Sequence, residues 1–472
     1  MAEPTIKNGE EHFFPIIYEG NGAGQRVGKF LPFTDQATIA NSLIFDSASN
    51  AGLTRTPSSA GNSKTFTVSV WAKRCVLGDQ SGSNTYGQRI FNAGSTSPSN
   101  FFDIKWSGSG DTEGANRLHI REYSSSAEQI EYWTNRTFED TSKWYHILLA
   151  VDTTQSTSGD RIKLYVDGDQ ITNWYRSNAP SLNFDTRVNS TVVHNVGKFT
   201  GATTNNLDGY LAEFNLVDGQ ALLPASFGIT DTSTGRWIPK TVEPFPTTTT
   251  DIAVTVVSSG GNKYALDGVT QDTVTLIEGA TYKFDQSDSS NSGHPLRFST
   301  TSDGTHGSGS EYTTGVTTVG TPGSSGAYTQ ITVAVGAPTL YYYCTNHSGM
   351  GGTANTQDQY GTNGFRLTFA DSSSFGDDTS GNTNDFTATN LATTDQTTDS
   401  PTQNHATLAV NGPNVSSSFS EGNLKVTFPT SSAMTGGLST LKMVSGKYYM
   451  EVTVNSISSA GLVLGIMGSD RY

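Results

Sequence analysis

Short apolar stretches, separated by runs rich in Gly, Ser, Thr and Asn, recur along this chain. Alternation of apolar and polar residues over roughly four to eight positions is the pattern of a half-buried strand. Residues 66–72 alternate strictly, and residues 145–152 form a fuller apolar run suited to the centre of a sandwich. Helical periodicity is almost absent. The sequence therefore predicts an all-β, multidomain protein with many turns.

Shifts in composition divide the chain. All six tryptophans precede residue 240, which separates the core of the first part from a tryptophan-free remainder. Proline-rich residues 239–246, followed by four threonines, form a predicted linker. The beginning of the chain has few apolar pairs to bury, so we expect it to order only against a partner. The predicted units are an N-terminal arm at 1–40, a first sandwich at 41–240, a second sandwich at 245–358 and a third, incomplete one at 361–472.

The predicted sandwich at 41–240 carries the strands of two paired sheets. Asp167-Gly168 is a pair typical of a tight hairpin turn. With Trp144-Tyr145-His146, these strands resemble a laminin-G-like, concanavalin-A-type jelly roll. Such domains bind glycans or calcium, but no carboxylate constellation is visible here, so a calcium ligand stays unknown. The predicted strands are 42–46, 66–72, 145–152, 161–168 and 207–214, and Asp152, Asp167 and Asp208 are expected to be turn residues.

Two reactive side chains of this unit are predicted to be structural. His146 alternates with apolar neighbours, which is the pattern of a histidine satisfied within a sheet rather than of a catalyst. Cys75 follows a core strand and is expected to pack as a small apolar group.

A closely spaced set of candidate metal ligands follows a predicted aromatic strand at 341–343. Cys344, His347 and Met350 are spaced three residues apart. Thiolate and thioether together with imidazole select copper, and two His and one Cys with a distant Met form a blue-copper site. A second imidazole, that of His294, lies 50 residues before Cys344, far enough to come from a different strand. Zinc is the weaker alternative, because structural zinc sites rarely recruit a thioether.

Residues 251–352, with this Cys-x-x-His-x-x-Met loop, resemble a cupredoxin domain of the short-loop kind. The resemblance implies His294, Cys344 and His347 as strong copper ligands and Met350 as the weak axial one. A cupredoxin fold can also be kept as a building block with its metal site empty, so both states stay open. His306 lies in a Gly-rich run and is expected to be a solvated loop histidine. The supporting strands are predicted at 251–257, 273–277 and 330–335.

The last unit is predicted to be an unfinished sandwich. Residues 364–369 open it as a strand, and a long polar stretch follows at 371–404. Strands predicted at 422–428, 445–454 and 461–466 resemble the opening half of a SPRY-like sandwich. The pattern stops before the later strands, so we expect either a second chain or further sequence to complete it.

Charge and cysteine content narrow the partners. A formal net charge of −15 disfavours nucleic acid, whose phosphates require clustered Lys and Arg. No run approaches the roughly 18 apolar residues of a membrane helix, and the N-terminus lacks the pattern of a signal peptide. We therefore expect that the protein is made in a cytoplasm and does not insert into a membrane. The two cysteines lie in different predicted units, which leaves no disulfide framework.

The order of the units adds a second resemblance. The jelly roll, Trp237 to Lys240, residues 360–365 and residues 395–404 are similar to fibre and host-recognition proteins of marine bacterial viruses, with the cupredoxin-like unit as an insertion. The resemblance implies a virion protein that is released by lysis and attached through the arm at 1–40 to other virion proteins. It also implies a homotrimer that contacts a host-surface glycan or protein, with avidity strengthening weak contacts.

Three functions remain in play. The first is a structural and adhesive virion component, either a tail fibre or a capsid-attached fibre. The second is a copper redox protein. The third is a hydrolase, which the sequence does not favour: no carboxylate pair is nominated for glycoside hydrolysis, and Gly307-Ser308-Gly309-Ser310 has the wrong spacing for a nucleophile elbow. We therefore predict no catalysis.

Overall fold

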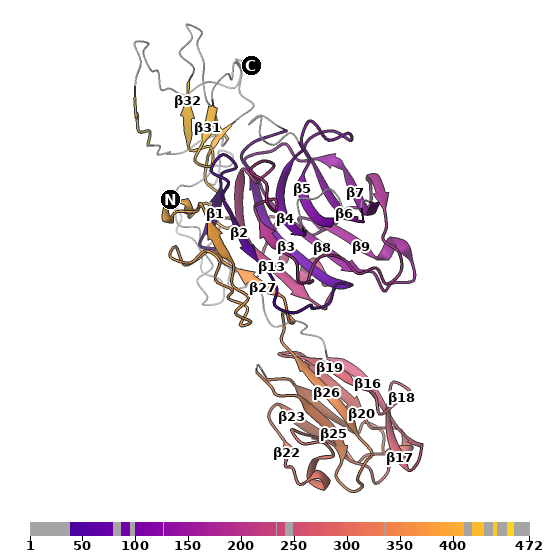
Figure 1. Ribbon diagram of the computed structural model, residues 1–472. Helices are drawn as coiled ribbons and strands as arrows, with labels where there is room; N and C mark the ends of the chain where they lie inside the picture. Colours follow the sequence, from indigo (N-terminus) through magenta and orange to yellow (C-terminus); the bar gives the residue numbers. More distant parts are fainter. Residues whose placement is uncertain are drawn as a thin grey trace.

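The computed structural model describes residues 38–78, 86–94, 100–125, 127–232, 234–240, 249–334, 336–409, 418–428, 438–440 and 451–456. These residues form β-strands and short 3-10 helices, as the all-β prediction requires (Figure 1). No helix among them is long and apolar enough to cross a membrane. The predicted arm up to residue 37, most of the linker and most of the strands expected at 445–454 and 461–466 lie outside the described residues.

The first sandwich consists of two eight-stranded sheets. One sheet runs β10 (Asp169–Gln170), β9 (Ile162–Val166), β8 (Trp144–Asp152), β3 (Thr65–Arg74), β13 (Gly209–Asp218), β1 (Ser42–Phe45) and β29 (Gln396–Thr397), and β27 (Phe365–Leu367) also pairs with β13. The other runs β11 (Trp174–Asn178), β7 (Ala127–Thr137), β6 (Arg117–Ser124), β5 (Asn100–Trp106), β4 (Gln88–Gly94), β12 (His194–Val196), β2 (Gly52–Arg55) and β28 (Thr387–Thr389).

Side-chain alternation places the core between these sheets. On β3, Phe66, Val68 and Val70 are buried in the main core, while Trp71 belongs to a smaller cluster on the other face. This is the inward and outward alternation that a strand imposes. The five strands predicted in this unit correspond to β1, β3, β8, β9 and β13.

Residues that follow the second unit complete the first sandwich. β27 pairs with β13, β28 with β2 and β29 with β1, all antiparallel. Phe365, Leu367, Phe369, Phe375 and Phe386 are buried in the same core as the strands before residue 220. The prediction of a separate sandwich over 361–472 is therefore wrong for residues 365–397. The predicted polar stretch at 371–404 contains β28 and β29, which have three and two residues. Strands this short leave no alternating pattern in the sequence, and packing decides which sheet they join.

A buried ion pair fixes the segment after β29. Lys73 Nζ lies 2.7 Å from Asp399 Oδ2, and both side chains are almost fully buried. Trp144 Nε1 donates to the other carboxylate oxygen at 3.0 Å. Each charge is thus paired and hydrogen-bonded, as buried charges must be. Beyond this segment, the described residues contain two small ladders, β30 (Leu408–Ala409) with β33 (Leu438–Ser439) and β31 (Ser418–Ser420) with β32 (Lys425–Thr427).

The second sandwich has a six-stranded and a five-stranded sheet. The first runs β18 (Val269–Thr270), β17 (Asn262–Leu266), β16 (Thr250–Ser258), β20 (Thr281–Asp285), β24 (Tyr328–Thr332) and β23 (Val316–Val319). The other runs β19 (Val274–Ile277), β26 (Gly352–Gln357), β25 (Leu340–Cys344), β21 (Leu296–Ser299) and β22 (Glu311–Tyr312). The three predicted strands of this unit are found as β16, β19 and β24.

Smaller elements connect these strands. The 3-10 helices are η1 (Ser158–Asp160), η2 (Pro224–Ser226), η3 (Ser289–Asn291), η4 (Gly304–Gly307) and η5 (Thr393–Asp395), and β14 (Gly228–Thr230) pairs with β15 (Trp237–Pro239).

The second sandwich is inserted into the first. On the outgoing side, Lys240 N donates to Phe227 O at 3.1 Å. On the returning side, Asp218 N donates to Tyr360 O at 2.7 Å. Phe227 and Tyr360 belong to one apolar cluster of the first sandwich. The chain therefore leaves and re-enters the first sandwich at the same region, and the second sandwich extends from it (Figure 1).

Candidate metal centre

Two neighbouring strands of the second sandwich bring the predicted ligands together. β21 and β25 are antiparallel, with Leu296 opposite Cys344. His294 lies two residues before Leu296, so it is next to the end of β25. The loop from β25 to β26 then carries His347 and Met350 past the same point. Strand register therefore closes the 50-residue separation between His294 and Cys344.

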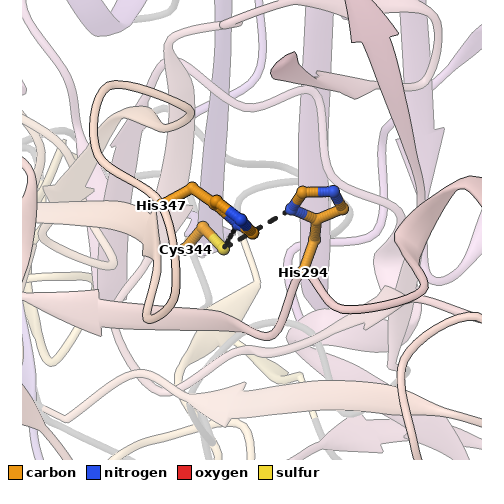
Figure 2. Close-up of side chains that lie close together, drawn as sticks. All are labelled: His294, Cys344 and His347. Atoms are coloured by element: carbon orange, nitrogen blue, oxygen red, sulfur yellow. Dashed lines mark hydrogen bonds between the residues drawn. The ribbon is translucent and has the colours of Figure 1, made fainter.

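The three side chains converge on one point (Figure 2). Cys344 Sγ lies 3.8 Å from His294 Nδ1 and 3.7 Å from His347 Nδ1. The three ligand atoms all lie within 4.8 Å of one another. A trigonal ion with a metal–sulfur distance of about 2.3 Å and metal–nitrogen distances of about 2.0 Å separates sulfur from nitrogen by roughly 3.8 Å. The two observed sulfur–nitrogen distances therefore match those of a sulfur and a nitrogen bound to one ion.

Met350 lies in the interior of the second sandwich. Its side chain is 1% exposed and belongs to the same apolar cluster as Cys344. Its carbonyl accepts a hydrogen bond from Tyr264 N at 2.9 Å. The backbone of the predicted axial ligand is thus fixed, and its role toward a metal stays a prediction.

Hydrogen bonds hold the two ligand segments in place. Tyr264 Oη and Gln286 Nε2 both donate to His294 O, at 2.8 and 2.9 Å. Asn346 Nδ2 donates to Gly293 O at 2.9 Å, which joins the Cys344 loop to the His294 segment. Such outer contacts orient ligands before a metal arrives. The site is therefore organised by the apoprotein.

The two imidazoles differ in exposure. His294 is 9% exposed, whereas His347 is exposed to solvent. Burial, and then the charge of His347, lower the pKa of His294 below its ordinary value. A lower pKa keeps this imidazole neutral at physiological pH, and neutral imidazole is the form that binds metal. Protons therefore compete less with a metal at His294.

His306 makes a contact that its sequence context did not predict. The residue is exposed, as expected of a loop histidine. Its Nε2 nevertheless lies 3.1 Å from the carbonyl oxygen of Cys344. The two residues are 38 positions apart, and no local pattern of a Gly-rich run could have indicated the contact.

A buried Ser–His pair in the first sandwich lacks the protonation that catalysis needs. Ser69 Oγ lies 2.9 Å from His146 Nε2, and Trp237 Nε1 donates to His146 Nδ1 at 3.0 Å. Indole N–H can only donate, so Nδ1 carries no proton and Nε2 must donate to Ser69. Burial lowers the pKa of His146 to about 3. His146 therefore has no free lone pair facing Ser69 and is the satisfied sheet histidine predicted.

The remaining predicted residues have structural roles. Burial raises the pKa of the Cys75 thiol, and the side chain packs in an apolar cluster. Asp208 accepts from Ser47, Asp167 from the His146 amide and Asp152 from Thr154. Among the described residues, the group of His294, Cys344 and His347 is the one place where three or more such ligand side chains meet.

Comparison with known proteins gives similarity of architecture only. No protein-family model and no curated protein matches this chain. A SAP-like pentraxin from Limulus polyphemus is 12% identical over 39% of this chain and 79% of its own, with a TM-score of 0.27. Domains LG4–5 of mouse laminin alpha1 are 12% identical over 66% and 74%, with a TM-score of 0.27. Tailspike protein 2 of the Escherichia coli O157:H7 bacteriophage CAB120 is 12% identical over 41% and 27%, with a TM-score of 0.25.

Proposed function

We propose that the inserted sandwich binds copper, with His294, Cys344 and His347 as strong ligands and Met350 as the weak axial ligand. The observation that carries the proposal is that Cys344 Sγ lies 3.8 Å from His294 Nδ1 and 3.7 Å from His347 Nδ1, the separation of a sulfur and a nitrogen bound to one ion. Thiolate and imidazole donors favour copper, and the buried thioether at Met350 favours it over zinc. When bound, copper would supply an ion able to cycle between Cu(I) and Cu(II).

Visible absorption and electron spin resonance after addition of Cu(II) test this proposal. We expect an intense thiolate charge-transfer band at about 600 nm. Cys344→Ser should abolish the band because the thiolate is lost. Cys75→Ser is the matched control, since Cys75 is buried in the other sandwich and should leave the band intact. A colourless wild-type protein, or a band that survives in Cys344→Ser, would contradict the assignment.

The surroundings of the site favour metal-linked stability over electron transfer. Exposed residues around the site include Asn262 of β17 and, in the Cys344 loop, Asn346 and Ser348, all polar. The core of a docking surface is usually enriched in aromatic residues, Met and Arg, none of which is among these three. A ligand that binds only the folded state instead adds RT ln(1 + [L]/Kd), about 3 kcal/mol at a hundredfold excess over Kd. We therefore assign copper a stabilising role here.

For the whole chain we propose a structural and adhesive component of a bacterial virus particle, a tail fibre that attaches to the host surface. Support comes from an intact first sandwich that carries a second one as an insertion, and from the similarity of residues 237–240, 360–365 and 395–404 to such fibres. In this proposal residues 1–40 bind other virion proteins and three copies assemble. Loops of the sandwiches contact a host glycan or protein, without catalysis.

Immunogold labelling of particles of the encoding virus tests the location. Antibody against residues 41–240 should label the tail, whereas labelling of the head would support the capsid-attached alternative. Absence of label from the particle would contradict a virion role.

Two further measurements test the proposed trimer and the proposed lack of catalysis. Sedimentation equilibrium should give a mass three times the 50.3 kDa of the chain. Incubation of the protein with capsular polysaccharide should release no sugar.

A further inference from the structure

The connection from β21 to β22 folds back over the predicted copper loop. It contains η4 (Gly304–Gly307), which lies directly after Asp303. His306 Nε2 lies 3.1 Å from Cys344 O, at the start of the loop. Gly349 N donates to Asp303 Oδ1 at 2.8 Å, at the end of the loop. Residues 303–306 thus form hydrogen bonds with both ends of the loop that carries His347.

The backbone of this segment is built for close approach. Asp303 has φ 59° and Gly304 has φ 54°, both in the left-handed region. Asp is among the few side chains enriched there. A Cβ on Gly304 would lie 2.5 Å from the ring of Tyr343, the residue before Cys344. Packing against β25 therefore holds Asp303 and Gly304 in a conformation that a free chain seldom adopts.

The hydrogen bond to Cys344 fixes a direction as well as a position. A carbonyl oxygen only accepts, so His306 Nε2 must carry the proton and donate. The bond holds the peptide that follows Cys344, and thereby the orientation of the thiol relative to His347. On the other side of the loop, Thr345 N donates to Pro295 O at 3.1 Å. The loop is therefore held between the His294 segment and the η4 connection.

We propose that Asp303 and His306 are positioning residues of the copper centre, which together form a clamp on residues 344–349. The proposal rests on the copper binding proposed above. The clamp presents Cys344 and His347 already placed for the metal, so that binding does not have to order the loop. Loss of such supporting contacts typically weakens metal affinity by roughly 10- to 100-fold.

Four variants of the full chain separate the hydrogen bonds from general damage. His306→Leu removes the donor and His306→Gln keeps an amide donor. Asp303→Gly removes the acceptor while tolerating a positive φ, and Asp303→Asn keeps an oxygen acceptor and also tolerates that conformation. Ser302→Ala is the control, because Ser302 is an exposed neighbour in the same connection.

Amide hydrogen exchange without metal is the first readout, because it does not depend on copper. We expect exchange at Gly349 to accelerate at least tenfold in Asp303→Gly, and exchange at Thr345 to accelerate in His306→Leu. The conservative variants and Ser302→Ala should match the wild type. Equal exchange in the wild type and all five variants would overturn the clamp, whether or not copper binds.

Copper titration is the second readout. In His306→Leu and Asp303→Gly we expect the Cu(II) affinity to fall by roughly 10- to 100-fold. The charge-transfer band and the reduction potential should both shift in these two variants. His306→Gln should restore all three. A wild type without the band refutes copper binding while the exchange data still decide the clamp. A wild-type band with unchanged affinity and potential in both disruptive variants refutes the positioning role.

Discussion

His146 and His294 are both buried histidines, and their neighbours give them opposite roles. The indole N–H of Trp237 occupies Nδ1 of His146, so no lone pair of that ring remains for a ligand. Nδ1 of His294 instead faces the sulfur of Cys344. At the residue scale, the direction of the hydrogen-bonding partners, more than burial itself, decides which imidazole can bind a metal.

Glu122 provides a prediction on pH at this scale. The side chain is fully buried, and one of its oxygens accepts from Arg187 N at 3.0 Å while the other has no hydrogen-bond partner. Burial raises the pKa of Glu122 from 4.5 to about 8. A raised folded-state pKa gives stability that is complete below the unfolded pKa of about 4.5 and declines as pH rises toward 8.

Glu122→Gln should therefore flatten the pH dependence of unfolding. Glutamine imitates the protonated acid, so its midpoint of unfolding should equal that of the wild type at pH 4.5 and exceed it at pH 8. At pH 8 the free energy of unfolding of the variant should exceed that of the wild type by an amount on the order of a few kcal/mol. Urea denaturation at both pH values, followed by tryptophan fluorescence, measures it. Parallel curves for the two proteins at both pH values would show that Glu122 ionises freely.

At the scale of elements, very short strands close the first sandwich. β28 and β29 contain three and two residues, yet they pair with β2 and β1. The aromatic residues near them contribute to the main core. Burial of a large apolar side chain is worth about 1.5–3 kcal/mol, so the five buried residues between Phe365 and Phe386 contribute on the order of 10 kcal/mol.

Two deletions test this division of the chain. A chain that ends at Lys240 should fail to fold cooperatively, because the lost contribution rivals the whole stability of a typical domain. A chain in which a flexible linker of about eight residues replaces residues 241–358 should fold, since both cut ends lie on the first sandwich. Thermal melts followed by tryptophan fluorescence distinguish them. Cooperative melting of the shorter chain would show that residues 365–397 are dispensable.

At the scale of the molecule, the two sandwiches can be observed separately. All six tryptophans belong to the first sandwich, and the inserted one has none. Fluorescence therefore reports the first sandwich alone, whereas calorimetry reports both. The four predicted copper ligands all lie in the inserted sandwich.

Saturating copper should raise the calorimetric transition of the insertion and leave the tryptophan transition unchanged. A stabilisation of about 3 kcal/mol corresponds to a shift of roughly 10 °C or more for a domain of about 100 residues. Cys344→Ser with copper is the control and should melt like the metal-free wild type. Identical melting with copper and with chelator would exclude a stabilising role for the metal.

The sequence by itself determined the all-β class, the strands β1, β3, β8, β9, β13, β16, β19 and β24, and the identity of Cys344, His347 and Met350 as candidates. These features are local: strand alternation has a period of two, and the ligand spacing lies within one loop. Only the tertiary structure decided that β27 to β29 belong to the first sandwich and that His306 reaches Cys344. Those contacts join residues tens to hundreds of positions apart, and they form where a shared core outweighs the entropy of closing the chain between them.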